Sequence, residues 1–173
     1  YFGPVKLMLK LLPKMRERKQ GHIVNISSIG VQTNTPRFSA YVASKAALDA
    51  FSRSIASEMI DDGVTITTIH MPMIAPTKMY RRFPTSTPEK AAEMIADAII
   101  HKPKRIATPL GTLGQLLYAI NPRSMDYILN TAYQLFPDSR AARGETREPE
   151  APSTDEDASR EQVAFAYLMR GVH

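Results

Sequence analysis

The 173-residue sequence has no cysteine and no apolar run close to the roughly 18 residues that a membrane-spanning helix needs. Without cysteine the chain can form neither a disulfide framework nor a thiolate metal site, which fits a protein of the reducing cytoplasm. The first 20 residues also lack the layout of a secretory signal peptide. These absences favour a cytoplasmic chain without a transmembrane segment.

Metal-binding and phosphate-binding patterns are missing as well. The four histidines lie far apart and have no carboxylates at ligand spacing, so we predict no metal site. The eight glycines are scattered, and Gly111 and Gly114 lack the spacing and the clear preceding strand of a dinucleotide-binding loop. The chain opens at Tyr1 without an initiator Met, in residues that already suggest a helix. We therefore expect a piece of a longer protein.

The net charge of +5 is unevenly distributed. Residues 1–144 hold 19 basic and 10 acidic side chains, whereas residues 145–173 hold 3 and 7. A basic body can attract nucleic acid or an anionic membrane surface. The basic residues occur only in small groups, however, so a solvated surface is the simpler interpretation and we predict no nucleic-acid partner.

The hydrophobic pattern alternates between helical and strand periods. It predicts helices over residues 3–19, 40–59 and 87–102, and strands over residues 22–27, 64–70 and 104–108. Such alternation is typical of a parallel α/β sheet. On the second helix, we expect Asp49, Arg53 and Glu58 to form the solvated side.

Two apolar helices are predicted next, over residues 110–121 and 124–136. The alternatives are packing onto the core, a lid over an apolar substrate and membrane contact. Core packing is favoured over the lid, and membrane contact is the least favoured because an interfacial helix needs more basic residues. Residues 138–160 are rich in Pro, Ser, Glu and Asp and predict disorder; residues 162–169 predict a short helix. The expected regions are 1–109, 110–137 and 138–173.

One group of residues has a spacing typical of acid–base catalysis. Tyr41 and Lys45 are four residues apart, hence one turn apart on the same helix face. A nearby cation lowers the pKa of a phenol from about 10 and makes it a usable proton donor and acceptor. Ser28 directly follows a predicted buried strand, and the carboxyl ends of strands in open α/β sheets are where ligands bind. A hydroxyl at this position can hydrogen-bond a substrate carbonyl.

These residues resemble the catalytic segment of a known family. Residues 21–30, GHIVNISSIG, followed by residues 39–47, SAYVASKAA, are similar to the corresponding segment of short-chain dehydrogenases/reductases, especially the bacterial branch that includes fatty acyl-CoA reductases. The resemblance implies the C-terminal part of a Rossmann-like doubly wound parallel sheet, three strands with flanking helices, whose N-terminal nucleotide-binding half is missing. It also implies NAD or NADP as the cofactor.

The resemblance assigns a role to each residue. Tyr41 is expected to exchange a proton with the carbonyl or alcohol oxygen. Lys45 is expected to hold the nicotinamide ribose hydroxyls and lower the pKa of Tyr41, and Ser28 to orient the substrate oxygen. After the second strand the family has Pro-Gly and then a Thr near the nicotinamide amide. Here Pro72 and Thr77 fill those places, but the Gly is replaced and several residues of the branch are absent, so we expect a shortened cofactor loop.

Two functions follow as hypotheses. The first is an NAD(P)-dependent oxidoreductase that reduces a carbonyl or oxidises an alcohol on an apolar small molecule, for which the resemblance points to a fatty acyl compound. The alternative is a truncated, catalytically silent remnant or a non-enzymatic interaction module, since the expected glycine-rich loop and the Asn that completes the family's proton relay both fall outside the sequence. A homodimer or homotetramer is expected for a full-length form.

Overall fold

The computed structural model describes residues 1–74 and 86–135. Its elements, in chain order, are α1 (Phe2–Glu17), β1 (Gly21–Ser28), α2 (Ile29–Thr33), α3 (Ser39–Glu58), the 3-10 turn η1 (Ile60–Asp62), β2 (Val64–Met71), α4 (Pro88–His101), β3 (Arg105–Ile106), α5 (Pro109–Ile120) and α6 (Pro122–Leu135). The predicted helices and strands in these ranges are confirmed. Two details differ, because β3 has two residues and a short helix, α2, lies where we expected an irregular stretch.

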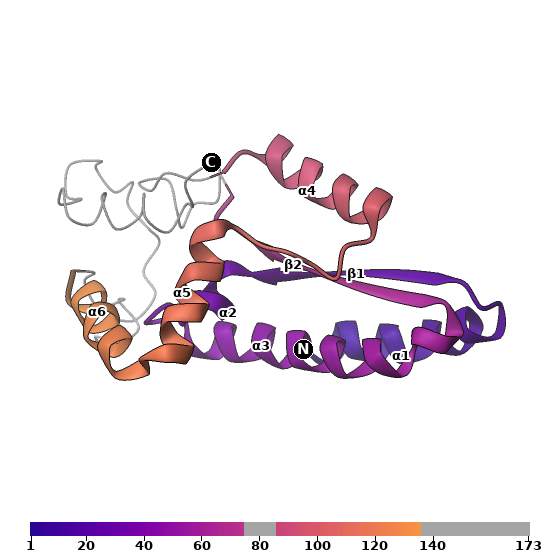
Figure 1. The fold of residues 1–173 in the computed structure, drawn as a ribbon, viewed down its shortest axis with the longest axis horizontal. Helices are drawn as coiled ribbons and strands as arrows, with labels where there is room; N and C mark the ends of the chain where they lie inside the picture. The colour runs from indigo at the N-terminus through magenta and orange to yellow at the C-terminus, as the bar shows by residue number, and fades with distance from the viewer. Residues whose placement is uncertain (75–85, 136–173) are drawn as a thin grey trace, which may run out of the picture.

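The three strands form one parallel sheet in the order β1-β2-β3. β1 and β2 are aligned along their whole length, from Gly21 opposite Val64 to Ser28 opposite Met71. Figure 1 shows α1 and α3 on one side of this sheet and α4 on the other. The predicted α/β architecture is therefore confirmed, and the carboxyl ends of β1 and β2 lie at the same edge.

The main core lies between the sheet and the helices α1 and α3. Met8 and Leu12 of α1, Leu48 of α3 and Ile66 of β2 belong to this buried cluster. Their spacing follows the helical and strand periods of the sequence, and burying each such side chain contributes about 1.5–3 kcal/mol. The core fixes α3 against β1 and β2 along most of its length.

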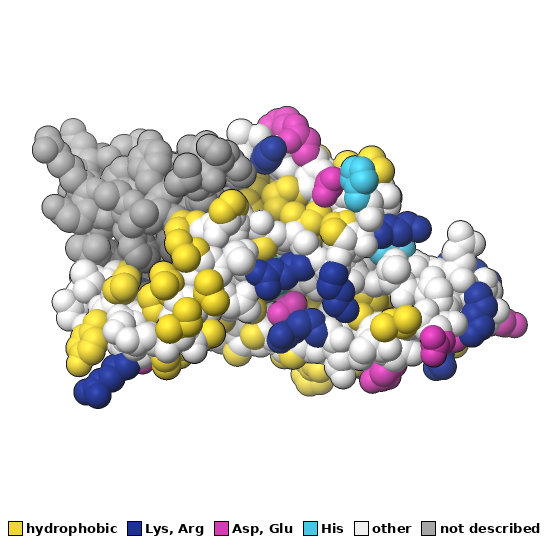
Figure 2. Space-filling view, viewed as in Figure 1, with side chains coloured by type: hydrophobic (Ala, Val, Ile, Leu, Met, Phe, Trp, Pro, Cys, Tyr) yellow, Lys and Arg dark blue, Asp and Glu magenta, His cyan; other side chains and the backbone are white. Residues whose placement is uncertain are grey.

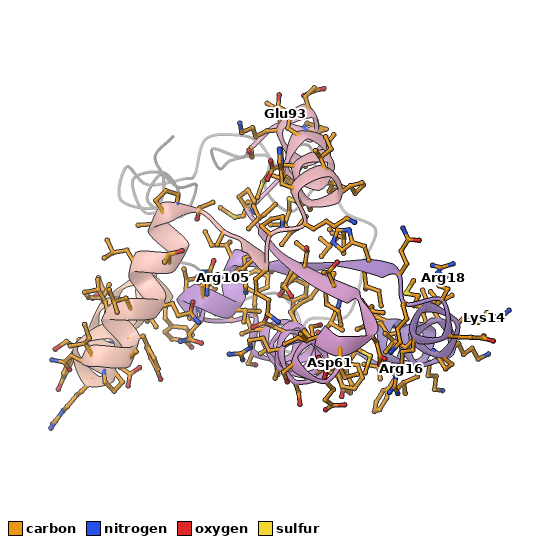
Figure 3. The ribbon with its side chains drawn as sticks, turned by 45° about the vertical axis from the view of Figure 1, so that its right-hand side comes forward. Lys14, Arg16, Arg18, Asp61, Glu93 and Arg105 are labelled. Atoms are coloured by element: carbon orange, nitrogen blue, oxygen red, sulfur yellow. The ribbon has the colours of Figure 1, made fainter. Side chains whose placement is uncertain are left out.

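Ion pairs close the end of the sheet where the strands begin. Arg16 Nε and Lys19 Nζ each lie 2.6 Å from a carboxylate oxygen of Asp62. Figure 3 labels Arg16 and Asp61 at this corner, where the end of α1 meets η1. Gly63 adopts φ +65°, and a Cβ there would collide with the backbone carbonyl of Lys19. This tight corner sets the alignment of β1 with β2.

Helices α5 and α6 lie beyond the carboxyl edge of the sheet, where α5 contacts α2 (Figure 1). Thr108 begins α5 by accepting a hydrogen bond from Gly111 N–H at 3.1 Å. α6 begins at Pro122, two residues earlier than predicted. Within residues 1–74 and 86–135, no helix is long and apolar enough to cross a bilayer. The predicted disorder of 138–160 and the helix 162–169 fall outside the described residues.

Candidate active site

Ser28 has two structural roles at the carboxyl end of β1. It is the last residue of the strand and the N-cap of α2, because its Oγ accepts a hydrogen bond from Gly30 N–H at 3.1 Å. A hydroxyl that accepts one hydrogen bond still has its own hydrogen to donate. Ser28 can therefore donate to a substrate oxygen while it holds the start of α2.

Helix α3 presents Tyr41 and Lys45 near its beginning. The Tyr41 side chain is 48% exposed, so its hydroxyl is open to a bound molecule. Lys45 is partly buried, and its Nζ donates to the backbone carbonyl of Ile26 in β1 at 2.9 Å. The same Nζ lies 6.0 Å from the centre of the Tyr41 ring. Tyr41 and Lys45 thus share one face of α3, as their spacing predicted, and the ammonium contacts β1 as well.

Contacts between α2 and α3 join Ser28 to this group. A Cβ placed on Gly30 would lie 3.4 Å from Ser28 Oγ and 3.4 Å from a methyl group of Val42, the residue after Tyr41. The first turn of α2 therefore packs against the turn of α3 that carries Tyr41. Ser28, Tyr41 and Lys45 all lie at the carboxyl edge of the sheet.

Pro72 lies at the same edge. It follows Met71, which is opposite Ser28 in the β1–β2 register, and its side chain is buried. The ends of the loop that follows are joined, since Ile74 and Ser86 form a parallel bridge and Ser86 N–H donates to the Met73 carbonyl at 2.7 Å. Thr77, the other expected cofactor contact, lies outside the described residues.

One expectation about α3 is wrong. Asp49 was expected on the solvated side of the helix, but it is 6% exposed and faces His70 of β2, which is 2% exposed. The nearest atoms, His70 Nε2 and Asp49 Oδ2, are 3.8 Å apart. Arg53, four residues further, remains exposed and lies 3.5 Å from the same oxygen. The pattern of α3 alone could not reveal this pair, because the histidine comes from the next strand.

The electrostatics of Asp49 reflect these neighbours. The neighbouring His70 side chain lowers the pKa of the Asp49 carboxyl below its usual range; burial acts in the opposite direction, and the charges of Arg53 and Arg105 add to the lowering. Asp49 is therefore an ionised carboxylate one helical turn beyond Lys45. No three His, Cys, Asp or Glu side chains gather at metal-binding distance in the described part of the chain.

The arrangement is suited to proton exchange with a substrate oxygen. An exposed phenol, an ammonium beside it and a hydroxyl with a free hydrogen meet at one edge of a parallel sheet. The ammonium of Lys45 has three hydrogens and uses one on Ile26, so two remain for the vicinal hydroxyls of a ribose. The donors present thus fit the nicotinamide-ribose end of a dinucleotide.

Comparisons with known proteins found similar sequences over the whole chain. The family model described as short chain dehydrogenase matches residues 1–87. A fatty acyl-CoA reductase of Acinetobacter baylyi is 50% identical over 178 residues, which cover 100% of this chain and 57% of the relative. An uncharacterized oxidoreductase of Mycobacterium tuberculosis is 46% identical over 178 residues, or 51% of its length. The chain spans about half the length of the curated relatives it matches.

Solved structures show the same fold. A short-chain dehydrogenase of Streptomyces avermitilis superimposes with a TM-score of 0.59 at 27% identity, covering 78% of this chain and 59% of that one. A short chain dehydrogenase of Burkholderia cenocepacia, solved in complex with NADP, has a TM-score of 0.63 at 20% identity over 75% of this chain and 55% of that one. At such identities the second likeness concerns the fold alone.

Proposed function

The chain belongs to the short-chain dehydrogenase/reductase family, and on this premise we propose that it is the catalytic part of an NAD(P)-dependent oxidoreductase acting on an apolar, fatty acyl-type carbonyl or alcohol. The observation that carries the proposal is the placement of Tyr41, Lys45 and Ser28 at one sheet edge, with the Lys45 ammonium beside the Tyr41 ring. The fatty acyl class is supported by the similarity to the Acinetobacter baylyi reductase.

In the reduction direction, Tyr41 is the acid. Its hydroxyl donates a proton to the carbonyl oxygen as that oxygen gains negative charge, and the same group removes the proton in alcohol oxidation. Lys45 places a positive charge 6.0 Å from the centre of the Tyr41 ring, where it would stabilise the negative charge that develops during the proton transfer. Ser28 donates a hydrogen bond to the same substrate oxygen and holds it in place, because the bond that it accepts from Gly30 leaves its own hydrogen available.

The nicotinamide cofactor supplies the hydride in reduction or accepts it in oxidation. Lys45 is the group that would hold its ribose, with the two ammonium hydrogens not used on Ile26. Pro72, buried behind the end of β2, would bound the nicotinamide side of the site, and Thr77 is proposed as a contact of the amide. Titration with NADH and with NADPH would show which of the two nucleotides binds more tightly.

The exposed surface of helix α5 supports the proposal that the substrate is apolar. Leu113, Leu116 and Leu117 are exposed on it, and Figure 2 shows apolar side chains gathered over α5 and α6. α5 is attached to α2, the helix that Ser28 begins, because Gly111 packs directly against Gln32. We therefore propose that region 110–137 is a lid beside the reactive oxygen, in preference to a packing extension.

An assembly through α1 and α3 is the proposed quaternary form of a full-length protein in the cytoplasm. Large apolar side chains of α1 are exposed outside its buried stripe of Val5, Met8 and Leu12, namely Phe2, Leu7, Leu9 and Leu11. Exposed apolar side chains gathered on one element are typical of interfaces between protein chains. Sedimentation should give a dimer or tetramer, and Leu7→Lys with Leu9→Lys should yield monomers.

Titration of the chain with NADH and NADPH, followed by thermal stability, tests the proposal. A cofactor at a hundred times its dissociation constant should stabilise the fold by about 2.7 kcal/mol. The chain should then oxidise the preferred nucleotide in the presence of a fatty acyl-CoA or fatty aldehyde, faster with long chains than with short ones. A folded chain that binds neither nucleotide and shows no turnover would favour the silent remnant or interaction module instead.

A further inference from the structure

A layer of polar side chains lies between the sheet and α3, close to the catalytic end. Residues two apart on a strand share a face, and register partners in a parallel pair do as well. Asn25 and Ser27 of β1 therefore share a face with Thr68 and His70 of β2. All four are buried, and Asn25 donates to Ser52 of α3 at 2.7 Å. This face is thus the one that α3 covers.

Two buried atoms of this layer have no hydrogen-bond partner. They are Ser27 Oγ and His70 Nδ1, on side chains that are each 2% exposed. Leaving a buried polar atom unpaired costs about 1–3 kcal/mol, so such atoms call for an explanation. Ser27 and His70 stand opposite each other in the register, with both side chains on the α3 side. The two unpaired atoms therefore belong to residues that are adjacent across the strand pair, and a rotation of the Ser27 hydroxyl would turn it toward the ring.

The hydrogen positions on His70 follow from Asp49. An ionised carboxylate only accepts hydrogen bonds, so the Nε2 that faces Asp49 Oδ2 must carry the hydrogen. In a neutral imidazole this leaves Nδ1 as an acceptor. A serine hydroxyl is a donor of the right type for that acceptor. The distance of 3.8 Å between Nε2 and Oδ2 is slightly longer than a hydrogen bond, and a small rotation of the ring shortens it.

We propose that Ser27, His70 and Asp49 form a buried hydrogen-bonded relay, from β1 through β2 to α3, that positions Lys45. Asp49 and Lys45 are one turn apart on the same face of α3, so a movement of the helix at Asp49 is passed to Lys45. Lys45 in turn donates to Ile26, the residue before Ser27. The chain of contacts starts and ends on β1. His70 and Asp49 are positioning residues, and the inference rests on the proposed role of Lys45.

The structure offers a matched control. His101 and Asp97 form another His–Asp pair, with Nδ1 and Oδ1 2.8 Å apart, on α4. Both side chains are exposed and solvated, so their removal leaves no buried group unpaired. The remaining charges that face Asp49 are Arg53 from α3 itself and Arg105 from β3. Changes that act through the relay should therefore appear with His70 and not with His101.

The first test concerns the ring of His70. Nitrogen NMR of the chain at neutral pH should show the tautomer with hydrogen on Nε2, and Ser27→Ala should shift the Nδ1 resonance toward that of an unbonded acceptor. A ring with hydrogen on Nδ1, or an Nδ1 resonance that Ser27→Ala leaves unchanged, overturns the relay. Neither observation depends on enzymatic activity.

The second test concerns Lys45. Its side-chain methylene resonances, assigned with Lys45→Arg, should move in His70→Leu and Asp49→Asn and return most of the way in His70→Gln, whose amide can donate in place of Nε2. His101→Leu and Asp97→Asn should leave them unchanged. If His70→Leu does not fold, Asp49→Asn and Ser27→Ala carry the same comparison. Unchanged Lys45 resonances in folded relay variants overturn the inference.

Turnover separates this inference from the proposed function. In an active protein, His70→Leu should lower kcat/KM about ten- to a hundredfold, because Lys45 is no longer held in place. His70→Gln should restore most of the lost kcat/KM. An inactive wild-type chain whose Lys45 resonances respond as stated would overturn the function and support the relay. An active chain with unaltered rates and resonances in His70→Leu would do the opposite.

Discussion

Helix α3 and the pair α5–α6 meet the rest of the molecule in different ways. α3 buries five residues of both polar and apolar character against the sheet, whereas α5 and α6, among the described residues, bury Gly111 and Ala132. The large apolar side chains of α5 and α6 stay mostly exposed (Figure 2). In the proposed function, the groups that need a fixed geometry lie on the tightly packed helix, and the surface that would adapt to a substrate lies on the loosely packed pair.

The largest effect should come from the reactive end of α3. Tyr41→Phe should lower turnover about 10²- to 10⁴-fold, because it removes the proton donor, and should leave the melting temperature unchanged, because the ring is half exposed. The matched control is Tyr127→Phe on α6, also an exposed tyrosine. Nucleotide oxidation and thermal melts measure both. Equal losses in the two variants would remove the assignment of chemistry to α3.

The next effect is on stability and compares the two regions directly. Leu48→Ala in α3 should lower the free energy of unfolding by about 2–5 kcal/mol, because the side chain is 4% exposed within the core. Leu116→Ala in α5, where the side chain is 56% exposed, should change it by less than about 0.5 kcal/mol. Urea unfolding gives both values. A large loss for Leu116→Ala would mean that α5 belongs to the core after all.

A smaller effect is expected on substrate choice. Leu113→Gln with Leu116→Gln should raise KM for a long acyl chain by roughly tenfold, since each lost apolar contact is worth about 1 kcal/mol or more. KM for a short acyl chain and the binding of the nucleotide should stay the same. Ile60→Gln in η1, a similar change on an exposed side chain at the opposite end of the sheet, is the control. Identical changes for short and long chains would contradict the proposed lid.

The smallest effect is expected at the corner that aligns β1 with β2. The hydrogen bonds from Lys19 and Arg16 lower the pKa of Asp62. Because the folded pKa is below the unfolded one, the stabilisation is present above the unfolded pKa and is lost as pH falls through the folded pKa. Asp62→Asn should slightly lower the melting temperature at neutral pH and make no difference in acid. A loss that persists in acid would point to packing instead of charge.

Much of the fold could be predicted from periodicity because its helices and strands each bury one continuous stripe. The stripe of α3 and the β-branched run of β2 placed both elements to within a residue or two. α2 was missed because five residues are too few to show a helical period. β3 is shorter than its predicted strand because it pairs with β2 only at Arg105 and Ile106.

The residues of the candidate site also differ in whether the sequence alone could place them. Ser28, Tyr41 and Lys45 could be predicted because one strand end and one helix turn contain them. Asp49 could not, because an aspartate four residues before an arginine looks like an exposed helical pair. Its burial is decided by His70, which only the register of the sheet brings beneath α3. The burial of a polar group that pairs through a tertiary contact cannot be predicted from a single sequence.

Ser28 ends one element and starts the next, and in the proposed reaction it also donates its hydrogen to the substrate oxygen. Few substitutions should therefore be tolerated at position 28 during evolution. Most replacements would lose the N-cap, worth about 1 kcal/mol, together with the substrate contact. Aspartate would retain the cap alone, because an ionised carboxylate has no hydrogen to donate, whereas threonine would retain both the cap and the hydroxyl donor. A homologue that lost the enzymatic activity would still need a capping residue at this position for its stability. A homologue with aspartate in place of Ser28 would therefore be expected to keep the fold without the reaction.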